Sequence, residues 1–309
     1  MTHPLAERLH GIIPPVITPL TEEGMFDPDS AERLYRHHLE AGVHGLFLFG
    51  SSGEGPLLRD FDRVEALDVA VKTVDSSVPL LVGTMEPGTD QVIAQGLRVQ
   101  EQGADALVVC PPFYFPPTQK EILTHFRKIH EAIDLPILVY DIPYTAKVKV
   151  ELQTMLTLAE EGTVIGAKDS SGDSVSFRRL LVKRPSGFKL FTGSELLIDS
   201  VLLQGADGTV PGLANVAPEL FVQLYDQWQE GSTEQAVETQ ERIVRLFDMF
   251  IPPEGAFQAG YFLGAMKTAM KHRGIITTNR TCDPFTQFTA EDEERIHTIM
   301  SDLDVLQVS

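Results

Sequence analysis

The stretch GTVIGAKDSSGD, residues 162–173, joins a short apolar run to an abrupt polar turn, and Lys168 stands at the junction. The run at 164–167 is too short for a helix. Short aliphatic runs bounded by small polar residues are typical of buried parallel strands. The stretch therefore predicts a buried strand that ends in a lysine.

Seven similar apolar runs occur elsewhere in the chain, with amphipathic segments between them. The segment 27–42, for example, places Leu34, His38 and Leu39 on one helical face and ends in a glycine, which is typical of a helix end. Eight strands alternating with helices predict a (β/α)8 TIM barrel. A doubly wound open sheet is the alternative, but no early GxGxxG motif supports it. The other runs are GIIPPVITP (11–19), GLFLFG (45–50), VPLLVG (78–83), DALVVC (105–110), LPILVYDIP (135–143), FKLFTG (188–193) and DGTVPG (207–212).

The last part of the chain changes character, because helical patterns follow one another without a strand between them. We predict that residues 1–225 form the barrel and that residues 226–309 form a C-terminal helical extension packed on it. Met266 and Met270, one helical turn apart, are predicted to be packing residues.

The composition favours a large buried core, since 43 % of the 309 residues are hydrophobic and 22 % are charged. A formal net charge of −19 disfavours nucleic acid and anionic membranes as partners, because phosphate groups are bound by basic patches. We expect no signal peptide and no membrane span, because no apolar run approaches the roughly 18 residues that a span needs. We therefore expect a cytoplasmic protein.

The cysteines and histidines do not indicate a disulfide framework or a metal site. Cys110 follows an apolar run and is predicted to be buried. The nine histidines form no HxH at a strand end and no HExxH, and His37 and His38 are interpreted as solvated or core-edge residues of a helix. We expect no metal and no cofactor.

The active site of such a barrel lies at the C-terminal ends of the strands, where Lys168 is found. A lysine in apolar surroundings is a source of neutral amine, which can condense with a ketone to form an imine, as in class I aldolases. The alternative, favoured slightly by spacing alone, is a lysine that snorkels toward solvent or forms a salt bridge, for example with Asp169 or Asp173. Tyr140 ends another strand and is interpreted as a proton shuttle or as a half-buried core residue. The glycine-rich loop GSSGEG (50–55) predicts a backbone cradle for a carboxylate or phosphate, or simply a tight turn.

Three motifs together resemble the dihydrodipicolinate synthase / N-acetylneuraminate lyase family: GSSGE after the second strand, YDIP after the fifth and GAKDSSGD at the sixth. The resemblance extends from GIIPPVITPL to GAMKTAMKHRGI, which is nearly the whole chain. It implies a (β/α)8 barrel with C-terminal helices, a homotetramer built as a dimer of dimers, and chemistry on pyruvate through a lysine Schiff base.

The resemblance also implies roles for individual residues. Lys168 matches the Schiff-base lysine and Tyr140 the proton-relay tyrosine. Ser51 and Ser52 match the paired hydroxyl positions of a motif that, starting at Gly50, holds the pyruvate carboxylate, and Ser51 joins the relay. Two further positions complete the pyruvate half of the site: Tyr114, matching a tyrosine contributed by a neighbouring subunit, and Val210, matching an aliphatic residue near the pyruvate.

The aldehyde half of the site differs between branches of the family. Thr145 stands where dihydrodipicolinate synthases carry an arginine for a second carboxylate, which argues against that substrate. Glu195 is followed by a leucine rather than forming the Asp-Glu pair of N-acetylneuraminate lyases. Ser170, Gly193 and Glu195 look more like the 2-keto-3-deoxygluconate aldolase branch, in which such residues bind hydroxyl groups. The leading hypothesis is reversible cleavage of a 2-keto-3-deoxy sugar acid to pyruvate and a hydroxyaldehyde.

Several alternatives use the same lysine. They are dihydrodipicolinate synthase, a dehydratase or deaminase of the family, and an aromatic hydratase-aldolase. The last is considered because Phe113, Phe115 and Ile142 are predicted to line an apolar pocket. A ligand-binding barrel without catalysis is the alternative outside the enzyme class.

Overall fold

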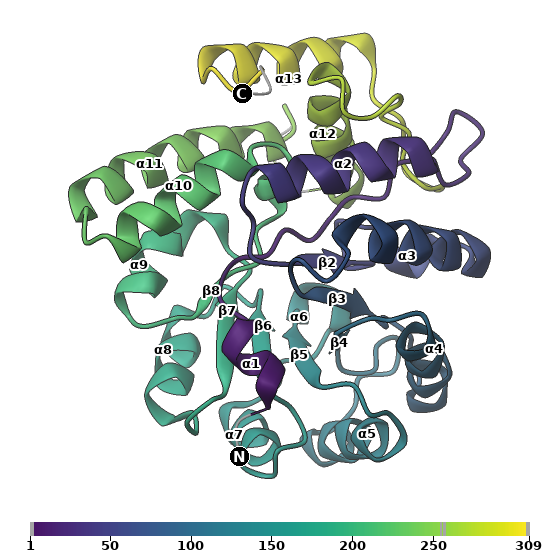
Figure 1. Ribbon diagram of the computed structural model, residues 1–309, viewed down its shortest axis with the longest axis vertical. Helices are drawn as coiled ribbons and strands as arrows, with labels where there is room; N and C mark the ends of the chain where they lie inside the picture. The colour runs from purple at the N-terminus through teal and green to yellow at the C-terminus, as the bar shows by residue number, and fades with distance from the viewer. Residues whose placement is uncertain (1–2, 254, 256–257, 307–309) are drawn as a thin grey trace.

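Eight parallel strands form one sheet in the computed structural model, which describes residues 3–253, 255 and 258–306 (Figure 1). The order is β1-β8-β7-β6-β5-β4-β3-β2, so the first and last strands of the chain are neighbours. The strands are β1 (Gly11–Ile12), β2 (Leu46–Leu48), β3 (Leu80–Gly83), β4 (Ala106–Val109), β5 (Ile137–Asp141), β6 (Gly166–Asp169), β7 (Lys189–Thr192) and β8 (Gly208–Thr209).

The segment after β1 closes the sheet against β2. Pro14 and Pro15 interrupt the strand, because proline lacks the N–H that a strand ladder needs. The closure is made instead by the Phe47 N–H, which donates to Pro14 O at 3.0 Å, and by the Val16 N–H, which donates to Phe47 O at 2.9 Å. The predicted (β/α)8 barrel is confirmed.

Helices connect the strands and cover the outside of the barrel (Figure 1). Some helices begin with a side-chain cap: Asp27 accepts from the Ser30 N–H at 3.1 Å, and Thr118 and Glu121 form a capping box. The helices are α1 (Pro4–Arg8), α2 (Pro28–Glu40), α3 (Asp60–Val74), α4 (Thr89–Glu101), α5 (Gln119–Ala132), α6 (Pro143–Ala146), α7 (Leu152–Glu160), α8 (Ser174–Lys183), α9 (Ile198–Leu203), α10 (Pro218–Gln229), α11 (Thr233–Leu246), α12 (Ala259–His272) and α13 (Ala290–Asp302). Short 3₁₀ helices are η1 (Gly55–Leu57), η2 (Glu195–Leu197), η3 (Gly212–Asn215) and η4 (Phe247–Phe250).

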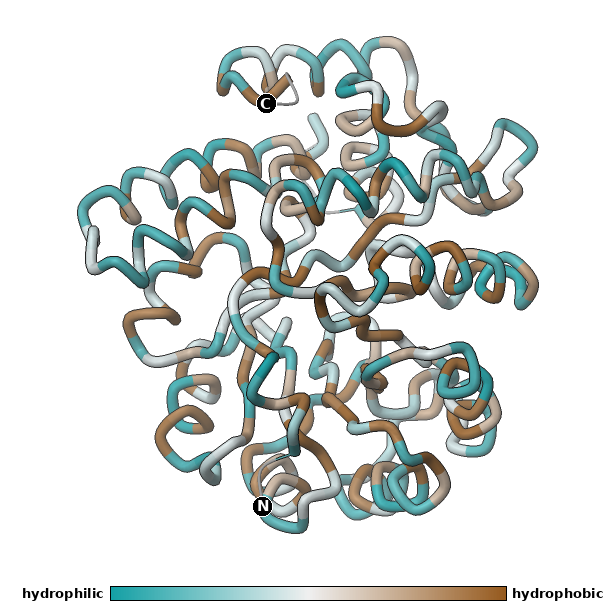
Figure 2. Tube along the Cα trace, viewed as in Figure 1, coloured by the Kyte–Doolittle hydropathy of each residue, from teal (hydrophilic) through white to brown (hydrophobic). Residues whose placement is uncertain are grey.

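The alternation of side chains along each strand produces two apolar clusters. In β5, Leu138 and Tyr140 point into the barrel, whereas Ile137 and Val139 point toward the surrounding helices. Figure 2 shows hydrophobic residues along the central strands and alternating polar and apolar residues along the outer helices. The side chain of an inward-pointing residue at a strand end therefore lies at the mouth of the barrel.

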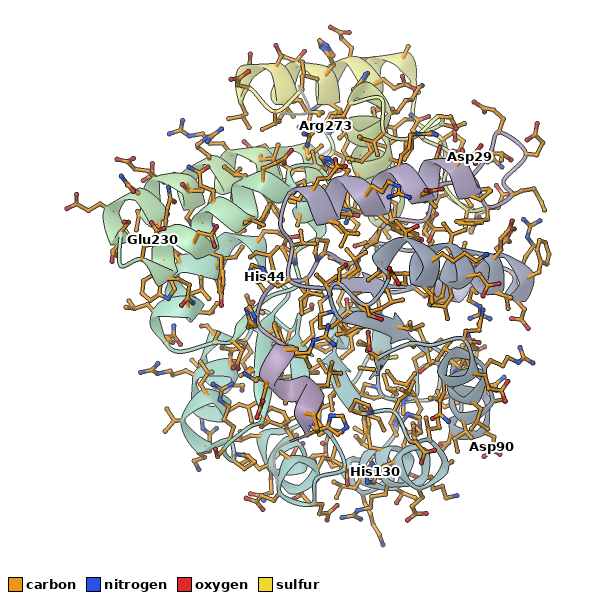
Figure 3. All side chains as sticks on the ribbon, in the orientation of Figure 1. Asp29, His44, Asp90, His130, Glu230 and Arg273 are labelled. Carbon is orange, nitrogen blue, oxygen red and sulfur yellow. The ribbon has the colours of Figure 1, made fainter. Side chains whose placement is uncertain are left out.

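The C-terminal helices pack on the barrel, and α10 and α11 lie side by side (Figure 1). Met266 and Met270 of α12 are completely buried, as predicted. Arg273, labelled in Figure 3, follows α12. It donates to Val216 O and, at 2.5 Å, to the Glu219 carboxylate. The boundary predicted at residue 225 falls inside α10, the helix that follows β8, and the division into barrel and extension stays a prediction.

The structure also shows the burial of Cys110 and of two histidines and the character of the helices. Cys110 is buried, as predicted. The interpretation of His37 and His38 as solvated or core-edge residues is wrong, because both side chains are buried, that of His38 completely. In the described ranges, no helix has both the length and the apolar character needed to cross a membrane.

Candidate active site

Lys168 lies on the inner face of β6, near the C-terminal end of the strand. It is in register with Tyr140 of β5 and with Phe191 of β7. Only 6 % of Lys168 is exposed, and its Nζ lies 4.3 Å from the centre of the Tyr140 ring and 5.4 Å from that of Phe47. The barrel therefore holds the amine against two aromatic faces.

The alternative in which Lys168 pairs with a neighbouring aspartate is wrong. The carboxylate of Asp169 points to the outside of the barrel and pairs with Lys149 Nζ at 3.1 Å. Asp173 caps α8, accepting from the Ser176 N–H at 2.9 Å. Within the described structure, neither carboxylate forms an ion pair with Lys168, so the amine remains directed into the barrel.

Tyr140 and the loop after β2 approach each other above the lysine. The hydroxyl of Tyr140 lies 3.3 Å from Ser51 Oγ. The loop is tightly wound: Phe49 and Glu54 have φ values of 59° and 55°, and a Cβ on Gly55 would lie 2.0 Å from Phe49 O. Ser51 and Ser52 are therefore held at the barrel mouth, where they line a common cavity with Lys168 and Tyr140.

Glu195 and its neighbours form the opposite wall. Glu195 is buried, and Oε1 accepts from the Gly212 N–H at 2.7 Å. Burial raises the pKa of this carboxyl, against the opposing effects of the backbone hydrogen bonds and of the charge on Lys168. Gly193 is required here, because a Cβ would lie 2.0 Å from Ser170 Oγ and 3.0 Å from Lys168 Cε. The glycine lets the serine and the lysine share the space above it.

A cavity of about 230 Å³ brings the predicted residues together. Its described lining also includes aromatic rings of the C-terminal segment, which sequence reasoning did not assign to the site: Phe247, Phe250 and Phe262. Gly50 is not part of the lining, although it directly precedes Ser51. The predicted residues in the lining are Ser51, Ser52, Tyr140, Thr145, Lys168, Ser170, Gly193, Glu195 and Val210.

A second, mostly apolar cavity of about 320 Å³ adjoins the first, since both are lined by Ser51, Tyr140 and Thr145. Phe113 and Ile142 line it, as predicted for an apolar pocket, together with Met85, Cys110 and Phe285.

The loop after β4 turns two predicted rings away from both cavities. Tyr114 has a φ of 75° and is 81 % exposed, and its ring packs edge-on against Phe115 at 5.0 Å. Phe115 is 80 % exposed, so the prediction that it lines an apolar pocket is wrong. The backbone at Tyr114 is therefore left-handed, and the rings of Tyr114 and Phe115 both lie on the surface.

A polar network behind the site was not recognised from the sequence. Asp141 and Asp169 are in register on β5 and β6 and point outward, one residue beyond Tyr140 and Lys168. Lys149 Nζ pairs with both carboxylates, and burial raises the pKa of Asp141 to about 6 against the opposing charge of Lys149. The signal in the sequence was the strand alternation, which places an aspartate on the outer face directly after each inward-facing site residue.

The fold and the residues at the barrel mouth together indicate a class of enzyme. A closed parallel barrel with a buried lysine at its catalytic end, beside a tyrosine and a hydroxyl-bearing loop, has the architecture of a class I aldolase. No three metal-binding side chains of the described residues gather into a group that could hold a metal ion. The chain belongs to the dihydrodipicolinate synthetase family, whose model matches residues 8–303, and it is a carbon–carbon lyase.

Relatives within this family carry different names. The chain is 32 % identical to a DapA-like lyase of Halobacterium salinarum, over 96 % of this chain and 95 % of the relative. It is 33 % identical to a 4-hydroxy-tetrahydrodipicolinate synthase of Methanopyrus kandleri (77 % and 80 %). It is 27 % identical to a probable 2-dehydro-3-deoxy-D-pentonate aldolase of Escherichia coli (98 % and 100 %). The solved structure of YagE, a prophage protein of E. coli K12 in complex with pyruvate, has a TM-score of 0.90 and 25 % identity, covering 96 % of this chain and 99 % of YagE.

Proposed function

We propose that this enzyme reversibly cleaves a 2-keto-3-deoxy sugar acid to pyruvate and a hydroxyaldehyde through a Schiff base on Lys168. The observation that carries the proposal is the position of the Lys168 amine, inside the barrel mouth and beside the Tyr140 ring. Two of the comparisons support the substrates: YagE was solved with pyruvate, and one relative is named a probable pentonate aldolase.

The loop after β2 supplies the binding site for the carboxylate of the keto acid. Backbone N–H groups of Ser51 and Ser52 at a glycine-rich turn suit an anion. With the carboxylate held there, C2 of the keto acid lies within reach of Lys168. The neutral amine adds to the C2 carbonyl, and loss of water with uptake of one proton from solvent leaves a protonated imine.

The iminium then draws electrons from the C3–C4 bond. The C4 hydroxyl gives its proton to Tyr140, and Tyr140 passes its own phenolic proton to Ser51, while the C3–C4 bond breaks and C4 leaves as an aldehyde. The enamine that remains takes a proton at C3, and water hydrolyses the imine to pyruvate and free Lys168. In the reverse direction the same groups form the bond.

The opposite wall selects the aldehyde. Ser170 and Glu195 line the cavity and can bind hydroxyl groups, and a site with buried polar groups disfavours partners that leave those groups unpaired. Thr145 offers no guanidinium for a second carboxylate. Among the described residues of the lining, Lys168 is the one cation, which favours an uncharged hydroxyaldehyde over an acidic one.

The apolar cavity supports a second candidate, cleavage of an aromatic keto acid. Phe113, Met85 and Phe285 present apolar surface beside Tyr140, and a planar aromatic aldehyde would bury its ring there. The lysine chemistry would be the same.

We also propose that the enzyme is a homotetramer in which Tyr114 reaches the relay of a neighbouring subunit. Its high exposure supports such a role, because a large aromatic side chain on the surface is suited to an interface. Light scattering of the wild type and of Tyr114→Ala tests this, with a smaller assembly and lower activity expected for the variant.

The substrate is tested by incubating the enzyme with 2-keto-3-deoxygluconate, 2-keto-3-deoxypentonate and benzylidenepyruvate, and by measuring pyruvate and aldehyde. We expect pyruvate from at least one sugar acid and none with Lys168→Ala. Turnover of benzylidenepyruvate alone would favour the second candidate. A keto acid product without an aldehyde would indicate a dehydratase or deaminase.

A further inference from the structure

Glu54 and Lys267 form an ion pair that is completely buried, with 0 % exposure of both side chains. Each charged group also has a backbone partner. Glu54 Oε1 accepts from the Cys282 N–H at 2.6 Å, and Lys267 Nζ donates to Arg280 O at 2.8 Å. The pair therefore joins the loop after β2, the helix α12 and the segment that follows it.

The two segments joined by the pair both contribute side chains to the lining of the 230 Å³ cavity. Glu54 belongs to the loop that carries Ser51 and Ser52. Lys267 lies one helical turn beyond Leu263 on the same face of α12, and Leu263 lines the cavity. The position of the loop relative to α12 thus depends on this contact.

Stability alone is a poor reason for such a pair, since a buried ion pair is often no more stabilising than apolar residues of the same size. The loop after β2, however, requires directional contacts, which apolar packing does not provide. Its backbone is held at positive φ at Phe49 and Glu54, and strained backbone persists where surrounding contacts fix it. The directional contacts of Glu54 fix the end of this loop.

We infer that Glu54 and Lys267 are positioning residues for the keto-acid carboxylate. This inference rests on the function proposed above. They hold the backbone N–H groups of residues 51 and 52 in place and set the distance to α12. Lys267 also cancels the negative charge of Glu54, which would otherwise repel an anion bound two residues away.

The test uses Glu54→Gln, Lys267→Met and the double variant. Borohydride trapping on Lys168, followed by mass spectrometry, gives the pyruvate concentration at half-maximal adduct, and a melting curve gives the Tm. Each single variant leaves one buried charge unpaired, so we expect a lower Tm and an increase of about tenfold in half-saturating pyruvate. The double variant removes both charges. We expect its Tm to recover, while half-saturating pyruvate stays about tenfold above the wild type because the contact between loop and helix is lost.

Asp207→Asn is the matched control. Asp207 precedes β8 at the other end of the barrel and pairs with Arg184 and, at 3.1 Å, with Lys189. This variant should lower the Tm and leave half-saturating pyruvate unchanged. Recovery of both Tm and half-saturation in the double variant would overturn the positioning role. Absence of any Lys168 adduct in the wild type would instead overturn the proposed function.

Discussion

The Lys168 amine lies 4.3 Å from the centre of the Tyr140 ring, and the Tyr140 hydroxyl lies 3.3 Å from Ser51 Oγ. The three residues come from β6, β5 and the loop after β2, which the barrel brings to one mouth. The amine that would form the imine therefore lies in the same site as the two hydroxyls that would move the proton.

Tyr140→Phe removes the hydroxyl and keeps the ring beside Lys168. We expect kcat for sugar-acid cleavage to fall by about 10²- to 10³-fold, because the C4 proton loses its acceptor. Half-saturating pyruvate in the trapping assay should stay within about threefold of the wild type, since imine formation uses Lys168 itself. A variant that retains wild-type kcat would exclude Tyr140 as the proton acceptor.

Gly193→Ala introduces a methyl group where there is no room for one. Its Cβ would lie 2.0 Å from Ser170 Oγ and 3.0 Å from Lys168 Cε. We expect the lysine side chain to be displaced and kcat to fall by about 10²-fold, as a misplacement of about 1 Å can cause. Circular dichroism should show a folded protein. Gly172→Ala, at a position with no atoms within 4 Å of the added Cβ but with a φ of 74°, controls for backbone strain without crowding.

Lys149→Met leaves Asp141 and Asp169 on the outer face of the barrel without their shared cation. We expect the free energy of unfolding at pH 8 to fall by about 3 kcal/mol, measured by urea denaturation. The loss should be smaller at pH 5, because the pKa of Asp141 is raised to about 6 and the carboxyl is then neutral in the folded protein. Lys147→Met, at an exposed site two residues earlier, should change stability by less than about 0.5 kcal/mol. Equal losses of unfolding free energy in Lys149→Met and Lys147→Met would contradict a stabilising role of the ion pairs made by Lys149.

His38 makes stability depend on pH. Burial lowers the pKa of its imidazole to about 3, whereas an unfolded chain titrates near 6.5. Between these values the unfolded state binds a proton that the folded state does not, so stability is complete above about pH 6.5 and is lost as the pH falls. From pH 7.5 to pH 5 the wild type should lose about 2 kcal/mol more than His38→Leu. Parallel losses in urea titrations of the two proteins would show that His38 does not carry this dependence.

The fold could be predicted because buried parallel strands and amphipathic helices have different apolar periods. The core of the candidate site could also be predicted, because Lys168, Tyr140 and Ser51 all stand at the ends of strands or directly after them. In the structure Tyr140 contacts both Lys168 and Ser51, as expected for residues at the same end of a parallel barrel.

The remaining features depend on backbone turns and on contacts between distant segments. The outward turn of Phe115 follows from the left-handed conformation of the residue before it, which no apolar pattern encodes. Phe262 reaches the cavity only because α12 packs over the barrel mouth. The pairing of Glu54 with Lys267 joins distant parts of the chain, and although Glu54 ends the GSSGE motif, nothing in the sequence indicates its partner.

The most direct test of the central claim is borohydride trapping of the wild-type enzyme with pyruvate, followed by peptide mapping. We predict a reduced pyruvate adduct on Lys168 and on no other lysine, and no adduct with Lys168→Ala. An adduct confined to another lysine, or a folded wild-type protein without any adduct, would contradict it.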